Sequence, residues 1–240
     1  MQIKDLKQRR KHNGRIKKNG RRVGRDKDEN KAIVDKLKEI GKKFLKEYVI
    51  KIGDLTIEPL WVEAYYFNDQ ASFADPFVHR DQDQMDNFGG LYFHHATDDS
   101  RSGVDICFSL SCQYYLSYLL KYTLVNGELV SQGFLSSKIR KAYEGVEDKK
   151  HILVKKSDHK ESQDIIGYTQ RIGLKPRKDE KEYQGYELAM VKNFDKKYTA
   201  KRKLPQIERL TKSYLSEIKT DKEKWCLEHL GYCLKEYKGG

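Results

Sequence analysis

The sequence predicts an α+β protein in which one folded domain follows a basic N-terminal arm. Apolar residues recur with helical spacing in well-separated segments, and short aromatic-rich runs bounded by turn residues lie between these segments. With 240 residues, including 16 Tyr and 9 Phe, the chain is long enough to form one sizeable core. No internal repeat is visible, so we assign residues 1–29 to the arm and residues 30–240 to the domain.

The arm concentrates positive charge. Residues 1–31 contain 13 Lys or Arg against 4 Asp or Glu, and thus carry nine of the net +12 charges. The arm lacks hydrophobic periodicity, so we expect it to be disordered in the free protein. Arginines and glycines alternate in it, which favours a polyanion such as double-stranded DNA as partner over a merely solubilising tail. The predicted DNA-binding residues are Arg9, Arg10, Lys11, Arg15, Lys17, Lys18, Arg21 and Arg22.

Four helices are predicted. The first begins at Asn30 and has apolar residues every three or four positions as far as Leu45. Others are expected over residues 136–143, after Pro205 and around residues 225–237. The charged segment 144–163 is expected to be a surface excursion.

Strands are predicted from short apolar runs and from turn residues between them. Gly53 and Asp54 suggest a turn, and Asn126-Gly127 is a strong hairpin signal. The pattern in residues 111–120 fits a helix or a strand equally well. The predicted strands are 48–52, 55–57, 60–67, 90–95, 104–108, 169–174 and 186–191, with a long polar loop at 68–89.

The stretch 58–109 contains the candidate site. Glu63 lies in a strongly aromatic strand, where a carboxylate is costly unless it is paired or used. Together with His79, His94, His95 and Asp105 it could line one cleft, and the flanking tyrosines could stack on a flat ligand such as a nucleobase. The same residue types also fit an ordinary aromatic core in which Glu63 is a satisfied buried acid.

Several other chemistries find no support. Residues 79–83 with the two histidines could bind a divalent ion, but no metal-ligand signature matches, so neither metal nor cofactor is predicted. Gly89-Gly90 is not followed by the Lys-Ser/Thr of a phosphate loop. The four cysteines show no CxxC spacing, and there is neither a secretory signal nor a long apolar run. We therefore expect a reduced, cytoplasmic, monomeric protein without membrane contact, associated with the nucleoid if it is bacterial.

The order of these segments resembles the alkyladenine (3-methyladenine) DNA glycosylase family. The resemblance is carried by Glu63-Ala64-Tyr65, Val78-His79-Arg80, Gly89-Gly90-Leu91-Tyr92 and Val104-Asp105-Ile106, and it covers residues 48–192. It implies a single domain built on a curved, mostly antiparallel sheet flanked by helices.

The resemblance also implies roles for individual residues. Glu63 matches the general base, Tyr65 and His79 match residues that hold the flipped base, and His94 falls on the other side of that pocket. Asp105 stands where the family usually has Asn. Tyr92 is the candidate nearest the wedge that fills the vacated stack.

Two departures from the family bear on specificity and mechanism. An ionised Asp105 offers only acceptors, so the pocket should prefer a base that presents donors or a cationic alkylated base. The family also presents an Arg on a later strand; this position aligns with Leu135-Ser136-Ser137, so the Arg is expected to be lost. The motif contains no convincing catalytic Lys, so no lyase step is expected.

The resulting prediction is a monofunctional DNA glycosylase of base excision repair, acting on an alkylated or otherwise modified base. The alternatives are a non-catalytic protein that binds modified bases in DNA and an N-glycosidase of free nucleotides.

Overall fold

The structure is a computed structural model in which part of the chain is described. The described residues are 17–18, 21–22, 27–68, 73–80, 82–94, 103–109, 114–156, 164–175, 181–195, 198, 204–217 and 221–230. From the basic arm they include two short strands, β1 (Lys17–Lys18) and β2 (Arg21–Arg22), which pair antiparallel. Four of the predicted DNA-binding residues, Arg9, Arg10, Lys11 and Arg15, lie outside the described residues.

Helices and strands then alternate irregularly along the chain, as expected for an α+β protein. The helices are α2 (Lys27–Glu47), α3 (Gln82–Asp86), α4 (Gln132–Glu144), α5 (Lys181–Gly185), α6 (Leu204–Glu217) and α7 (Lys222–Leu230). The strands are β3 (Tyr48–Ile52), β4 (Leu55–Asn68), β5 (Leu91–Phe93), β6 (Val104–Cys107), β7 (Tyr114–Val125), β8 (Glu128–Ser131), β9 (Leu153–Lys155), β10 (Ile166–Thr169) and β11 (Ala189–Lys192).

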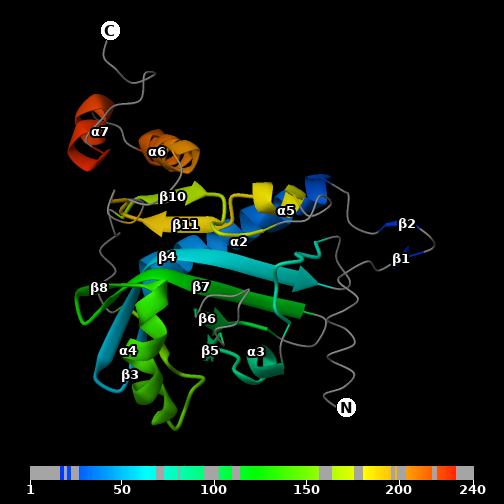
Figure 1. The fold of residues 1–240 in the computed structure, drawn as a ribbon, viewed down its shortest axis with the longest axis vertical. Coiled ribbons are helices and arrows are strands. Elements are labelled where there is room, and N and C mark those ends of the chain that lie inside the picture. Colours follow the sequence, from blue (N-terminus) through cyan, green and yellow to red (C-terminus); the bar gives the residue numbers. More distant parts are fainter. Residues whose placement is uncertain are drawn as a thin grey trace.

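The centre of the fold is a nine-stranded sheet in which all strand pairs are antiparallel. Its main path runs β10-β11-β4-β7-β6-β5, while β3 joins β4 to β9 and β8 pairs with β7. The sheet curls into a half-barrel with helices packed around it (Figure 1). The predicted α+β class, with one domain on a curved antiparallel sheet, is confirmed.

The long strands β4 and β7 form the backbone of this sheet. Both are rich in aromatic and β-branched residues, which pack well on a pleated surface. The pair runs from Ile57 opposite Val125 to Asn68 opposite Tyr114, with a shift of register around Pro59. Proline cannot donate to the ladder and is tolerated at such irregularities. Because the shift accommodates Pro59, the two strands predicted at 55–57 and 60–67 are one.

The two faces of β4 belong to different environments. Side chains alternate along a strand, so Val62, Ala64 and Tyr66 point to one face, into the largest hydrophobic cluster. On the other face, Trp61 packs in a second cluster with residues of α6. Glu63 shares this second face and therefore points away from α2.

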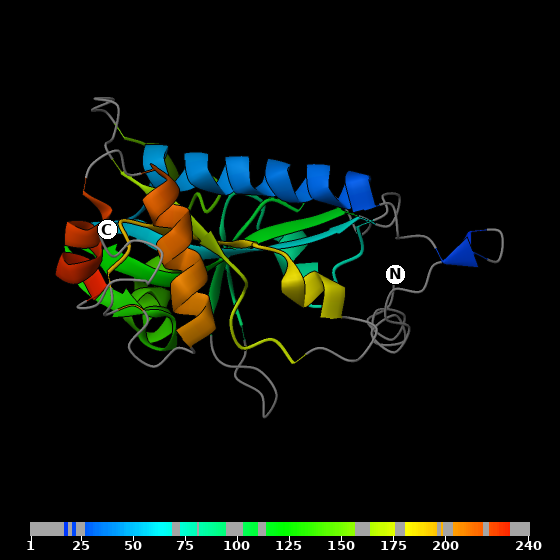
Figure 2. The same ribbon diagram turned by 90° about the horizontal axis from the view of Figure 1, so that it is seen from above.

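Helix α2 covers the first face of the sheet with its apolar side, and charged residues stabilise both of its ends. Asp28 and Glu29 lie in its first turn and Lys46 in its last, as the helix dipole favours. A Cβ on Gly41 would lie 2.2 Å from Met190 Sδ, so the absence of a side chain lets the helix approach β11 closely. Figure 2 shows α2 running along the sheet and α6 crossing in front of the strands, on the side nearer the viewer.

The predicted hairpin is confirmed and leads into α4. Asn126 and Gly127 both have positive φ, 48° and 84°, as a type I′ turn between β7 and β8 requires. Helix α4 follows at once and buries Leu135, Ile139 and Tyr143 against the sheet. The undecided pattern at 111–120 belongs to the strand β7.

Three predictions need correction. The strand expected at 169–174 ends at Thr169, because Arg171 leaves the sheet to bind a buried carboxylate described below. The segment 144–163 is not only a surface excursion, since β9 within it pairs with β3. The last helix, predicted at 225–237, begins earlier as α7, and residues 231–240 lie outside the described residues.

Helix α6 is held on β10 by a close contact at a glycine. A Cβ on Gly167 would lie 2.2 Å from Cε2 of the Tyr214 ring and 2.8 Å from Cδ1 of Leu210. The Tyr214 hydroxyl donates a hydrogen bond to the Val191 carbonyl, and its ring stacks on Trp225 of α7. The ring is therefore fixed, and little space is left for a methyl group.

Among the described helices, none is long and apolar enough to cross a membrane.

We expect Gly167→Ala to destabilise the protein by about 1–3 kcal/mol, because the added methyl group overpacks this contact. The change would be measured as a lower urea midpoint with an unchanged slope. Gly133→Ala is the matched control, since a Cβ there meets no atom within 4 Å and alanine favours the helix that contains it. Equal midpoints for wild type and Gly167→Ala would contradict the close packing of α6.

Candidate active site

Glu63 lies in the middle of β4, between Leu119 of β7 and Ala189 of β11. Its carboxylate is completely buried. Oε2 accepts a hydrogen bond from the Tyr65 hydroxyl at 3.1 Å, and Oε1 accepts one from the backbone N–H of Ile172 at 2.9 Å. A buried charge of this kind is tolerated only with such partners. Glu63, whose burial the sequence analysis identifies as costly in free energy, therefore has hydrogen-bond partners.

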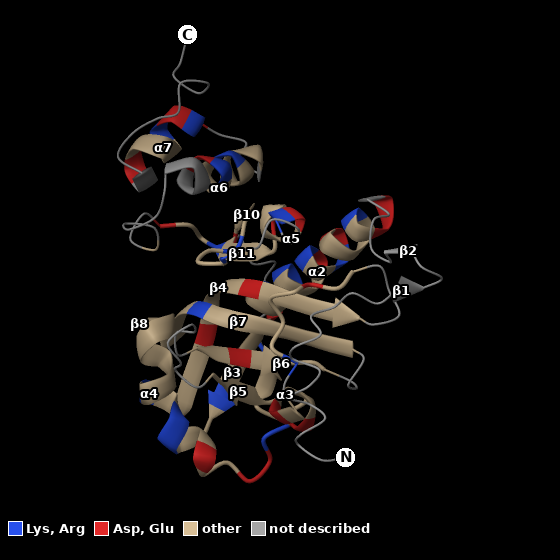
Figure 3. Cartoon of the chain, turned by 45° about the vertical axis from the view of Figure 1, so that its right-hand side comes forward, with Lys and Arg blue, Asp and Glu red and all other residues tan. Residues whose placement is uncertain are grey.

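Lys121 of β7 approaches the same carboxylate. Its Nζ lies 3.6 Å from Oε1 of Glu63. The lysine side chain keeps 10% of its exposure, whereas that of Glu63 keeps none. Lys121 is thus the member of the pair that solvent reaches. The central strands β4 and β7 contain few charged residues, so they are mainly tan in Figure 3.

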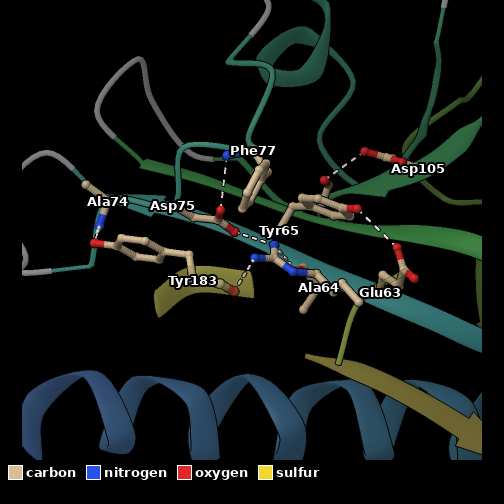
Figure 4. A network of polar contacts seen from close by, with 10 residues as sticks. Glu63, Ala64, Tyr65, Ala74, Asp75, Phe77, Asp105 and Tyr183 are labelled. Carbon is tan, nitrogen blue, oxygen red and sulfur yellow. Dashed lines mark hydrogen bonds and ion pairs between the residues drawn. The ribbon is translucent and has the colours of Figure 1, made fainter. Parts of the chain in front are cut away.

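Tyr65 is held as a neutral hydrogen-bond donor. Burial raises the pKa of its hydroxyl well above the ordinary value, and the charge on Glu63 raises this pKa further, while Arg171 acts in the opposite direction. The phenol therefore keeps its proton at neutral pH. Figure 4 shows its hydroxyl directed at Glu63.

A buried ion pair lies beside Tyr65. Arg171 and Asp75 are in direct contact through Nη1 and Oδ2, and both side chains are fully buried. Nη1 also donates to the Ala64 carbonyl at 3.1 Å, and Nη2 donates to the Tyr183 carbonyl at 3.0 Å. Figure 4 shows Asp75 and Tyr183 on the side of Tyr65 away from Asp105. Arg171 thus connects β4, the loop at residues 73–80 and α5.

The guanidinium also packs on aromatic rings. It lies 4.8 Å from the ring centre of Tyr65 and 5.5 Å from that of Phe77. Burial alone would lower the pKa of Arg171, but the neighbouring Asp75 and Tyr65 outweigh it and raise this pKa. The arginine therefore stays charged and fixes one face of Tyr65.

A second polar cluster surrounds Asp105 on β6. Its carboxylate contacts His94 Nε2 at 2.9 Å and accepts hydrogen bonds from the Ser117 hydroxyl at 2.8 Å and from the Gln84 amide at 3.4 Å. Burial would raise the pKa of Asp105, but the charge and hydrogen bond of His94 and the hydrogen bond of Ser117 outweigh it, so this pKa is lowered. Asp105 is ionised at neutral pH and acts as an acceptor.

Three further predicted residues surround this carboxylate. The His79 and His94 rings meet edge to face with centroids 4.7 Å apart, and the Tyr92 ring meets His94 at 5.0 Å. Tyr92 pairs with Asp105 across β5 and β6 and is only 6% exposed. It forms part of the wall of the cluster and does not project from the surface. His79 is exposed at its edge.

The two clusters meet at β7. Ser117, which binds Asp105, lies directly opposite Tyr65, which binds Glu63. Tyr65 lies between Glu63 and Asp105 in Figure 4. The structure therefore brings together all six predicted site residues of the domain, namely Glu63, Tyr65, His79, Tyr92, His94 and Asp105.

Asp105 makes stability depend on pH in a defined direction. Its folded-state pKa lies below the ordinary value of 3.8, so its stabilising effect is complete above that pH and is lost as the pH falls through the folded-state pKa. Asp105→Asn should lower the free energy of unfolding by about 1–3 kcal/mol at pH 7. In urea titrations of both proteins between pH 7 and pH 3, the difference should stay constant above about pH 4 and begin to shrink below it. A constant difference at all pH values would contradict an ionised Asp105.

Residue-based reasoning missed two basic side chains. The position of the family's Arg aligns with Leu135-Ser136-Ser137, which lie on α4. Two other basic residues lie at the site: Lys121 is beside Glu63, and Arg171 is beside Tyr65. Basic groups therefore stand at Glu63 and Tyr65 although the Arg of the family is expected to be lost at its aligned position. Lys121 could have been suspected by the argument applied to Glu63, since it too is a charge within an apolar strand.

The metal and DNA predictions are tested less directly. Among the described residues, no group of three or more His, Cys, Asp or Glu side chains could hold a metal ion. His95 and Asp81, which belonged to the metal alternative, lie outside the described residues. Lys17, Lys18, Arg21 and Arg22 form β1 and β2, which make a separate two-stranded sheet among the described strands.

No protein-family profile and no curated protein sequence matches this chain significantly. Functional inference for it therefore depends on the residues and on their geometry.

Proposed function

We propose that this protein is a DNA base N-glycosidase, which flips a damaged or modified base out of the duplex and hydrolyses its N-glycosidic bond. The observation that carries the proposal is the placement of Glu63. A fully buried carboxylate on the central strand, bound by a neutral tyrosine and a lysine, stands beside a second acidic and aromatic cluster. With this arrangement, the cluster at Glu63 can carry out the catalytic step while the cluster at Asp105 binds the base.

In this mechanism Glu63 orients a water molecule and takes up its proton as the water attacks C1′. Departure of the base leaves positive charge on the sugar, and the carboxylate stabilises that charge in a site of low dielectric constant. Tyr65 and the Ile172 N–H hold the carboxylate in position. An enzyme of this kind needs no metal or cofactor for base release.

The base would be held in the cluster around Asp105. Tyr65, His79, Tyr92 and His94 supply ring faces and edges, and unstacking a base costs a few kcal/mol that such contacts partly recover. Asp105 is an ionised acceptor, which favours a base with N–H donors or with positive charge. We therefore propose an alkylated or otherwise electron-poor purine as substrate.

The basic arm would supply contacts to DNA phosphates that do not depend on sequence. Its surplus of nine positive charges would release counterions on binding, so affinity should fall steeply with salt concentration. We propose that the protein acts on double-stranded DNA as a monomer in the cytoplasm.

One observation favours a second candidate function. Both carboxylate oxygens of Glu63 are already engaged and the side chain is fully buried, which also suits a protein that binds modified bases without reacting. Such a reader would bind DNA and release no base.

The test is base release from purified duplexes. Wild type and Glu63→Gln are incubated with duplexes that contain methylated or deaminated purines, and with the corresponding free nucleosides. Abasic sites are scored by alkaline strand cleavage and free bases by chromatography. Release from duplex DNA by wild type alone supports the proposal. Binding without release from any of these duplexes favours the reader, and release only from nucleosides favours a nucleotide enzyme.

A further inference from the structure

We propose that Lys121 gives the protein a second activity, cleavage of the DNA strand at the abasic site that base release creates. The inference rests on the proposed function, because the abasic sugar occupies the same site. It replaces the expectation of a glycosylase without a lyase step, which was based on the absence of a lysine from the sequence motif. The fold supplies the missing amine from a different strand.

The geometry favours the lysine as the group that meets the sugar. Lys121 Nζ lies 3.6 Å from the carboxylate that we assign to the attack on C1′. The lysine is the only member of this pair with solvent exposure, at 10% against 0% for Glu63. Of the two side chains, that of Lys121 is therefore the one that a ligand in solvent can contact.

The chemistry of the pair is complementary. An abasic sugar is in equilibrium with an open-chain aldehyde at C1′, and a lysine amine forms Schiff bases with carbonyl groups. Lysine is nucleophilic only as the neutral amine, which requires a neighbouring base. Glu63 is placed to take the ammonium proton.

The reaction balances without any further reactant. A proton passes from Lys121 to Glu63, and the amine adds to the aldehyde. Protonated Glu63 returns the proton to the new hydroxyl, which leaves as water, so that an iminium forms at C1′. Glu63 then removes a proton from C2′, a C2′–C3′ double bond forms, and the C3′–O bond to the 3′ phosphate breaks. Hydrolysis of the iminium restores Lys121.

Lys192, another buried lysine among the described residues, has different surroundings. Lys192 is also buried, with 4% exposure, and contacts Glu58 of the same strand β4. Glu58 is shared with Lys156 at 2.9 Å and lies nearer the start of the strand, away from the Asp105 cluster. Lys192 is therefore a matched control for a buried lysine that pairs with a β4 glutamate outside the site.

The experiment uses the full chain and duplex DNA with a preformed abasic site, so that it does not depend on base release. Sodium borohydride reduces an iminium to a stable secondary amine, which appears as a protein–DNA adduct on a denaturing gel. We expect an adduct and strand cleavage with wild type and with Lys192→Arg. With Lys121→Arg we expect at least a 100-fold lower rate of adduct formation. Thermal melting of each variant checks that it is folded.

A second measurement does not rely on variants. Proteolysis of the wild-type adduct and mass spectrometry should map the linkage to Lys121. No adduct with wild type, or an adduct mapped to the basic arm, would overturn the proposal. If wild type releases bases from modified duplexes but forms no adduct, only this inference fails. If it forms the Lys121 adduct but releases no tested base, the lyase inference stands without the glycosylase.

Discussion

Glu63→Gln should lower the single-turnover rate of base release by about 100- to 10,000-fold, the range expected for loss of a general base. Gln keeps the size of the side chain; its carbonyl oxygen can accept the hydrogen bond from the Ile172 N–H, and its amide N–H can donate to the Tyr65 hydroxyl. It can neither take up a proton nor stabilise a positive sugar. Binding to a duplex with the modified base should change little, since the proposed base contacts lie at Asp105. The measurement is single-turnover kinetics with excess protein, together with a binding titration.

Glu58→Gln provides a matched control. Glu58 lies on the same strand and also pairs with lysines, but its partners Lys156 and Lys192 belong to a different part of the sheet. Its substitution should leave base release within a few-fold of wild type. If both substitutions lower the rate equally, or if Glu63→Gln retains full activity, Glu63 is not the general base.

Arg171→Met should lower the free energy of unfolding by about 3–5 kcal/mol, because it leaves the Asp75 carboxylate buried without its ion-pair partner. It also removes donors from the Ala64 and Tyr183 carbonyls. For a domain of this size, the melting temperature should fall by about 6–20 °C. Differential scanning calorimetry and urea titration would measure the change.

Two further variants distinguish the stability lost by breaking the buried ion pair from the stability lost by removing any arginine. Arg140 also stacks on an aromatic ring, that of Phe93, but it is only partly buried, so Arg140→Met should cost about 1 kcal/mol or less. The double variant Arg171→Met with Asp75→Leu should recover part of the loss, because no unpaired charge remains buried. A cost for Arg171→Met no larger than that for Arg140→Met would contradict the ion pair.

The elements that could be predicted from the sequence are those with local signals. The Asn126-Gly127 turn requires positive φ at both residues, and the amphipathic pattern of α2 needs no knowledge of its partner. Glu63 could be singled out because the cost of burying a carboxylate among aromatic residues is a local property. The order of motifs, read through a family resemblance, then led to His94 and Asp105.

The rest depended on register and on contacts between distant segments. Arg171 and Asp75 are separated by most of the sheet along the chain, and no local pattern indicates that one pairs with the other. The extent of β10 could not be predicted, because Arg171 leaves the sheet to satisfy a charge on a loop. Ser117 became a site residue only once β7 was placed between β4 and β6.

The segment just after β10 has a consequence for the newly synthesised protein. It supplies both the N–H that orients Glu63 and the guanidinium that supports Tyr65, and Ile172 follows Glu63 by 109 positions along the chain. A nascent chain on the ribosome that already contains β4 to β7 still lacks these groups. Such a chain would expose an acidic, aromatic surface without the geometry for reaction. Competence for the proposed chemistry would thus arise only after the segment that contains Arg171 and Ile172 has been synthesised and has folded onto β4.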